Sequence, residues 1–135
     1  MSWSESLIRI SNYEVETLQK RLAEIVERRS RAEIRLALLA AEVEGEGARA
    51  REDAEAGWYH AGFLQGAKVR GEKIEAEIEA AQAEEAGARD ALAEAFEALK
   101  KFEHLAEQAR LADVKEAGRR ETMALDELGL RRATR

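Results

Sequence analysis

The sequence predicts an all-α fold, a long two-helix antiparallel coiled-coil hairpin with a C-terminal helical overhang, on three observations. The 135 residues include no proline, the residue that most strongly interrupts helices. Charged residues make up 37% of the chain, and three Phe, two Trp and two Tyr are too few aromatic residues for a compact globular core. Apolar residues recur at alternating spacings of three and four in both halves of the chain, as in a coiled coil. We expect a single hairpin domain over residues 1–135.

The first helix is expected over residues of about 4–56. Its apolar seam consists of Ile8, Val15, Leu18, Leu22, Ile25, Ala32, Leu36, Leu39 and Val43. Two starts are compatible with the sequence. Ser2 and Glu5 have the spacing of a capping box. Alternatively, Ser4 is the N-cap, and Trp3 before it packs onto the next turn of the helix as a hydrophobic staple.

The second helix is expected over about 63–130, after a turn at about 57–62. Its seam is richer in alanine and consists of Ile74, Ile78, Ala81, Ala88, Leu92, Ala95, Leu99, Phe102, Ala106 and Ala109. Glycine permits the positive φ angles that a tight turn between helices often needs, and this region contains Gly57, Gly62, Gly66 and Gly71. A rival turn at residues 45–47 would leave the end of the second seam without a matching seam on the first helix.

The two seams together predict a register for the hairpin. In an antiparallel pair, the numbers of facing residues add to a constant, and a constant of 117 brings the two seams together. Leu39, for example, would then face Ile78. The mirror point of this register falls between Trp58 and Tyr59, inside the expected turn.

The same register places Arg29 and Glu85 in adjacent layers of an otherwise apolar seam, where we expect them to pair. Two interpretations are open. The pair could fix the register, because slipping by one heptad would set each charge against apolar residues. Alternatively, both side chains could simply extend into water.

The charge balance excludes several classes of partner. The chain has 22 Lys and Arg against 28 Asp and Glu, a net charge of −6, so we expect no nucleic-acid binding.

The N-terminus lacks the pattern of a signal peptide, and no stretch approaches the roughly 18 apolar residues of a membrane span, so we expect no direct membrane insertion. The absence of cysteine fits the reducing cytoplasm.

The sequence offers no catalytic, cofactor or metal site, so we expect that the protein is not an enzyme. His60 and His104 lie on opposite arms, and no H-E-x-x-H pair is present. Lys68 is followed by Val69, where a nucleotide-binding loop requires Ser or Thr. The many carboxylates are typical of solvated helix faces, because an acid-base pair needs a pocket to separate its pKa values.

Two groups of apolar residues have no evident partner within the hairpin. The aromatic tip consists of Trp58, Tyr59, His60, Phe63 and Leu64, which either pack around the turn or bind a partner. The overhang, Ala117 to Arg135, is basic and amphipathic and is either a frayed terminus or a partner-binding helix. It carries Arg119, Arg120, Arg131, Arg132 and Arg135 beside Met123, Leu125, Leu128 and Leu130.

A hairpin of this length, with aromatic residues at its bend and a projecting C-terminal helix, resembles the FliJ family of flagellar export proteins and the related YscO-type proteins of type III secretion. The resemblance covers nearly the whole chain. It is most specific from Trp58 to Gln65 and on through Val69 to Ile74 and Ile78, a stretch similar to the family's aromatic and aliphatic entry into the second helix.

The resemblance implies a non-catalytic component of the flagellar type III protein export apparatus, which serves flagellar biogenesis, motility and chemotaxis. It implies a cytoplasmic location, peripheral to the inner membrane. The implied partners are the hexameric export ATPase, whose ring the paired helix ends would enter and activate like a central stalk, the cytoplasmic domain of the export gate membrane protein, and export chaperones that the protein escorts.

The resemblance also implies which residues bind. The export-gate contact near the tip would consist of Trp58, Tyr59, Phe63, Leu64 and Ile74. The contact with the ATPase ring would consist of Trp3, Leu7, Ile8, Arg119, Arg120, Met123, Leu125 and Leu128. Ala67 and Arg70 depart from the family's gate-binding face. The alternative function is a generic structural coiled-coil spacer or dimeric scaffold, which would have no need of the overhang.

Overall fold

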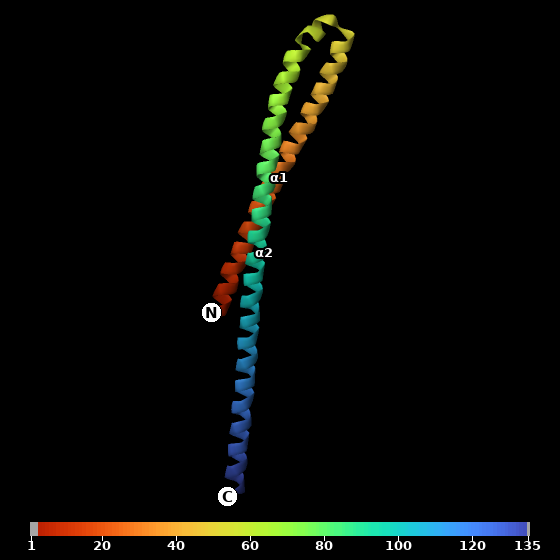
Figure 1. The fold of residues 1–135 in the computed structure, drawn as a ribbon. Coiled ribbons are helices and arrows are strands. Elements are labelled where there is room, and N and C mark those ends of the chain that lie inside the picture. Colours follow the sequence, from red (N-terminus) through yellow and green to blue (C-terminus); the bar gives the residue numbers. More distant parts are fainter. Residues whose placement is uncertain (1–2, 135) are drawn as a thin grey trace. The chain divides into compact units, whose positions relative to one another are not determined.

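The computed structural model describes residues 3–134, which form two long helices and no strand (Figure 1). Helix α1 spans Trp3–Glu52 and helix α2 spans Ala54–Ala133. The expected all-α, two-helix hairpin is therefore confirmed. Contacts divide the chain into a hairpin unit, Glu16–Ala93, and a terminal unit that joins the residues up to Val15 to those from Glu94 onward. Each unit is described by itself.

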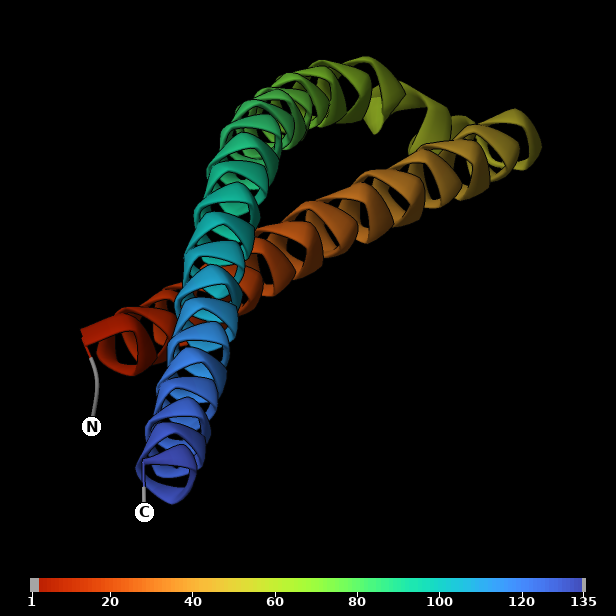
Figure 2. The same cartoon turned by 90° about the horizontal axis from the view of Figure 1, so that it is seen from below.

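In the hairpin unit, α1 and α2 run antiparallel on either side of a bend (Figures 1 and 2). Ion pairs between the arms establish this direction, because the partner number falls as the number on α1 rises. The pairs are Arg28 with Glu84, Arg35 with Glu77 and Glu42 with Arg70.

The core of the hairpin unit is the predicted heptad seam. Ile25, Ala32 and Leu39 are buried on α1, each seven residues from the next. On α2 the buried apolar residues are Ala81 and Ala88, which belong to the predicted seam, and Ala67, which extends it toward the bend. The buried apolar residues of α2 in this unit are thus all alanine, and such small side chains let two helices approach closely. This layer is thin, and no described side chain is less than 2% exposed.

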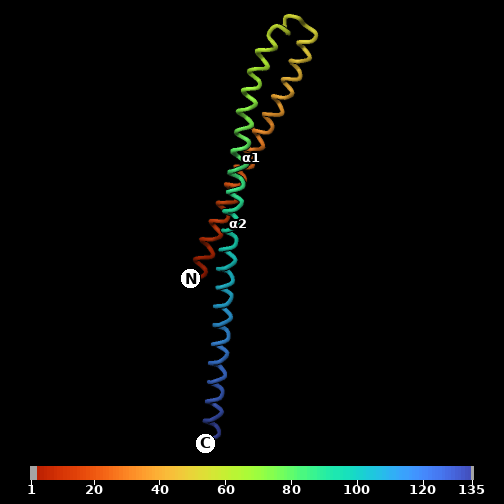
Figure 3. The backbone as a smooth tube through the Cα atoms, viewed as in Figure 1, coloured from red at the N-terminus to blue at the C-terminus, as the bar shows by residue number. Residues whose placement is uncertain are grey.

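The bend differs from the sequence-based expectation. The only residue between the two helices is Asp53, and residues 57–62 lie inside α2, so the first helix ends at Glu52 instead of residue 56 (Figure 3). The carboxylate of Asp53 accepts a hydrogen bond from the backbone N–H of Glu55 at 3.0 Å, and its carbonyl accepts one from Gly57 at 3.0 Å. Asp53 is therefore the N-cap of α2.

A capped helix start explains why the glycine cluster does not form the turn. None of the described glycines has a positive φ angle, so the reversal uses no left-handed glycine. The predicted register is wrong in the hairpin unit, because the ion pairs between the arms join residues whose numbers add to 112 instead of 117. A Cβ atom added to Gly71 would lie 3.6 Å from Cδ2 of Leu39, so these two residues, whose numbers add to 110 instead of 117, are neighbours across the seam.

In the terminal unit, the start of α1 packs against the second half of α2. Val15, Ala95 and Leu99 are buried there, together with the hydroxyl-bearing Ser4 and Ser11. Ser4 lies inside α1, so it is not the N-cap, and the alternative cap, Ser2, lies outside the described residues.

The expected overhang is present in the terminal unit. From Ala117 to Thr134, every residue of α2 and its last turn is exposed. Its final residue, Arg135, lies outside the described part of the chain.

Candidate partner-binding surfaces

The described residues contain no group of three or more side chains suited to hold a metal ion. Neither helix contains, within the described residues, a stretch long and apolar enough to cross a membrane. The concave surfaces considered below are open grooves along the helices.

An apolar groove of about 520 Å³ lies between the arms of the hairpin unit, near the bend. The α1 side is formed by Leu36, Leu39, Ala40 and Val43, and the α2 side by Leu64, Ala67, Lys68 and Glu75. Leu64 is 41% exposed, so its side chain is accessible at the edge of the groove. The groove thus has an aliphatic floor with one cation and one carboxylate among its α2 residues, a chemistry that suits an apolar peptide side chain.

The predicted gate residues occupy the first turns of α2 but do not form one cluster. Trp58 and Tyr59 are 82% and 68% exposed, and they do not line the apolar groove. Phe63 is half-buried, and the guanidinium carbon of Arg70 lies 6.0 Å from its ring centroid, a cation–π distance. Of the predicted residues, only Leu64 lines the groove; Ile74, which is also half-buried, does not.

Helix α1 also carries exposed apolar residues that the sequence analysis does not identify. Ile34 and Leu38 are 57% and 65% exposed, although the seam residues around them face α2. The signal was present in the sequence: Ile34, Leu38 and Ala41 follow the same spacing of four and three residues, offset from the seam.

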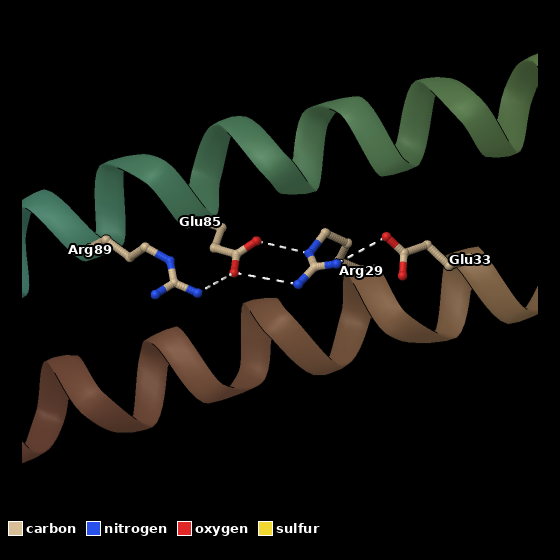
Figure 4. A network of polar contacts seen from close by, with 4 residues as sticks. All are labelled: Arg29, Glu33, Glu85 and Arg89. Carbon is tan, nitrogen blue, oxygen red and sulfur yellow. Dashed lines mark hydrogen bonds and ion pairs between the residues drawn. The ribbon is translucent and has the colours of Figure 1, made fainter.

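The polar layer of the hairpin unit is confirmed and is larger than expected (Figure 4). Arg29 Nε donates a hydrogen bond to Glu85 at 2.8 Å, across the seam. Arg89 Nη2 donates to the same carboxylate at 2.7 Å, and Arg29 Nη1 donates to Glu33 at 2.9 Å. The Glu85 side chain is only 11% exposed, so its charge is compensated by two guanidinium groups instead of by water.

This network shifts the pKa values of Glu85 and Arg29. Hydrogen bonds from Arg89 and then from Arg29 hold the pKa of Glu85 below its usual value, against the opposing effect of burial. Hydrogen bonds to Glu33 and then to Glu85 raise the pKa of Arg29. Arg29 and Glu85 therefore stay ionised at neutral pH, as a layer that fixes register requires.

The terminal unit contains a second groove, of about 690 Å³, beside the start of α1. Trp3, Glu5 and Ile8 line it from α1, and six residues from Glu103 to Asp113 line it from α2. Trp3 is 64% exposed, whereas the predicted residues Leu7 and Ile8 are half-buried. The structure therefore brings Trp3 and Ile8 together in one groove that is more polar than the groove near the bend.

The overhang exposes the other predicted residues of the ring contact. Met123, Leu125 and Leu128 are 56%, 68% and 52% exposed. Arg119 and Arg120 are not free cations, because both pair with Glu116 on their own helix. The basic character read from the sequence is thus partly neutralised within the helix.

Comparison with known proteins gives two relatives, from Caulobacter vibrioides strains NA1000 / CB15N and ATCC 19089 / CIP 103742 / CB 15, both called "Flagellar FliJ protein". Each is 57% identical to this chain over 131 residues, which cover 97% of this chain and 94% of the relative. No family model matches the chain. No solved structure matches the chain.

Proposed function

The chain belongs to the FliJ family of flagellar proteins, and from this premise we propose that it is a non-catalytic component of the flagellar type III protein export apparatus. In this role it activates the hexameric export ATPase as a central stalk does, contacts the cytoplasmic domain of the export gate, and escorts export chaperones. It works in the cytoplasm and reaches the inner membrane only through the export apparatus.

The observation that carries this proposal is the exposed helical overhang. Neighbouring exposed apolar side chains on a folded surface often mark a binding site, and Leu125 and Leu128, one turn apart, are exposed to 68% and 52%. A spacer that only holds two ends apart would need no such helix beyond its own packed seam. The overhang and the groove beside Trp3 belong to the same unit, so we assign both to the contact with the ATPase ring.

The export-gate contact is assigned to the hairpin unit near the bend. The apolar groove that Leu64 lines offers a place for an aliphatic side chain, and the exposed rings of Trp58 and Tyr59 offer aromatic anchors. Phe63 and Ile74 are half-buried and support this face from within the hairpin. The two contacts use residues of different units, so they can be separated by mutation.

The test uses the purified export ATPase and two altered chains. Deletion of residues 117–135 should abolish stimulation of ATP turnover, while helicity per residue and the melting temperature change little, because every described residue removed is exposed. The matched control, Trp58→Ala with Leu64→Ala, should stimulate the ATPase as the unaltered chain does but bind the gate domain more weakly. Full stimulation by the truncated chain would contradict the assignment of the overhang.

A further inference from the structure

The seam that packs α1 against α2 does not continue along the overhang as an apolar stripe. Past Ala109, the same spacing falls on Asp113, Glu116, Arg120, Met123, Glu127 and Leu130. Most of these are charged, and Glu116 and Glu127 are held in ion pairs by arginines one turn further along the helix. This face of the overhang is therefore mostly charged and does not continue the apolar seam.

A second apolar stripe occupies a different face of the same segment. It consists of Leu111, Val114, Gly118, Leu125 and Leu128, which follow a heptad pattern interrupted by Glu121 at the position between Gly118 and Leu125. The rotation is about 100° per residue, so this stripe lies on nearly the opposite side of α2 from the seam. Its four large residues are between 52% and 68% exposed.

The middle of this stripe permits close approach by another helix. A Cβ atom added to Gly118 would meet nothing within 4 Å, so the backbone there is uncovered between the two apolar pairs. One apolar pair lies on each side of the open glycine. This arrangement suits a partner helix that lies along α2, because a larger side chain of the partner can fill the space above the glycine.

The residues that border the stripe indicate which charge a partner helix should carry. In coiled-coil terms the flanking e and g positions are Arg110, Lys115, Ala117, Thr122, Ala124, Gly129 and Arg131, which include three cations and no acid. Arg110 and Arg131 pair with glutamates of their own helix, but both ion pairs are exposed and can yield to a partner.

The same flanks argue against a second copy of this chain. In a parallel pair of overhangs, Arg110 of one copy would face Lys115 of the other. In an antiparallel pair, Arg110 would face Arg131. Both arrangements set like charges together, and like charges at these positions are unfavourable.

We propose that the stripe docks an amphipathic helix of another protein, one whose apolar heptad seam is bordered by acidic residues, and forms a short coiled coil with it. This inference rests on the proposed function, because it names the chemistry of the partner that the overhang meets. The apolar side chains supply affinity and the cationic flanks select the acidic helix.

The test uses the full chain and two synthetic helical peptides of about three heptads, with Leu at a and d in both. One peptide carries Glu at e and g, and the other carries Lys. We expect the Glu peptide to bind about tenfold more tightly than the Lys peptide in fluorescence anisotropy at low salt, with the difference shrinking as salt is added. Reversal of the flanks, Lys115→Glu with Arg131→Glu, should invert the preference.

Two further variants separate the stripe from the rest of the overhang. Leu125→Ser with Leu128→Ser should abolish binding of the Glu peptide, whereas Leu130→Ser, which is equally exposed but on the seam side of the same helix, should leave it intact. Equal binding of both peptides, or binding that survives the double leucine change, would overturn the inference. Self-association in sedimentation that the leucine changes remove would also overturn it, because a second copy would then cover the stripe. If the unaltered chain stimulates the export ATPase but binds neither peptide, only the inference fails; if it does not stimulate the ATPase, the proposed function fails.

Discussion

Replacement of Gly62 by alanine tests where the chain turns. In the structure Gly62 lies inside α2, it has no positive φ angle, and a Cβ atom added there would meet nothing within 4 Å. Alanine loses less backbone entropy than glycine on entering a helix, so Gly62→Ala should stabilise the protein by about 0.5–1 kcal/mol. If residues 57–62 instead formed a turn with a left-handed glycine, the same change would be destabilising.

The assay is thermal unfolding followed by circular dichroism, in which this gain corresponds to a rise in Tm of about 2–4 °C. Gly57→Ala is the matched control, because a Cβ atom there would lie 3.3 Å from the carbonyl oxygen of Ala50. That contact is tight and involves backbone, so most of the gain should be lost. A lower Tm for Gly62→Ala would refute a helical residue 62 and return the turn to the glycine cluster.

Three other changes test the bend, the seam and the polar layer. Asp53→Ala should cost about 1 kcal/mol in urea unfolding by removing the N-cap of α2, and Asp53→Asn should retain most of the stability; equal losses would speak against a cap. Leu39→Ala should cost about 2 kcal/mol, whereas Leu38→Ala, at an exposed position, should be nearly neutral, and the reverse order would mean that the seam is misplaced. The pKa of Glu85 is lowered from 4.5, first by Arg89, so its contribution is present above pH 4.5 and is lost as the pH falls through the lowered pKa. The Tm of the unaltered chain should therefore fall more steeply below that pH than the Tm of Glu85→Gln, and parallel curves would exclude this role.

The seam could be predicted from the sequence because its buried apolar residues recur with a fixed period. Burial in a coiled coil depends on which residues share one face of a helix, and the spacing of Ile25, Ala32 and Leu39 determines that face without any further information. The pairing of Arg29 with Glu85 followed from the same periodicity, even though the assumed register was shifted.

The bend could not be predicted in the same way because it depends on one local hydrogen bond. The glycine cluster suggests a turn at residues 57–62, but glycine only permits unusual backbone angles, and the described glycines adopt no positive φ angle. The N-cap at Asp53 supplies a positive reason for α2 to start there, and an aspartate between two helical patterns was the available signal.

The candidate surfaces were predicted in part. The exposure of Trp58, Leu125 and Leu128 was expected, because the seam register leaves them without a place in the hairpin. Ile34 and Leu38 were missed, because the stretch around them is apolar on several faces and periodicity alone does not show which face is covered. Which exposed residues bind depends on the surface of a second molecule, and a single chain carries only half of that information.

The most direct test of the intramolecular hairpin is one distance between its two arms. The chain has no cysteine, so spin labels can be placed at Arg28→Cys and Glu84→Cys, a pair that forms an ion pair between the two arms. An intramolecular hairpin predicts a short distance, with helix axes about 10 Å apart, that does not change when labelled protein is diluted with unlabelled protein. A distance near 84 Å, the length of about 56 residues of continuous helix, or a short distance that disappears on dilution, would contradict the intramolecular hairpin.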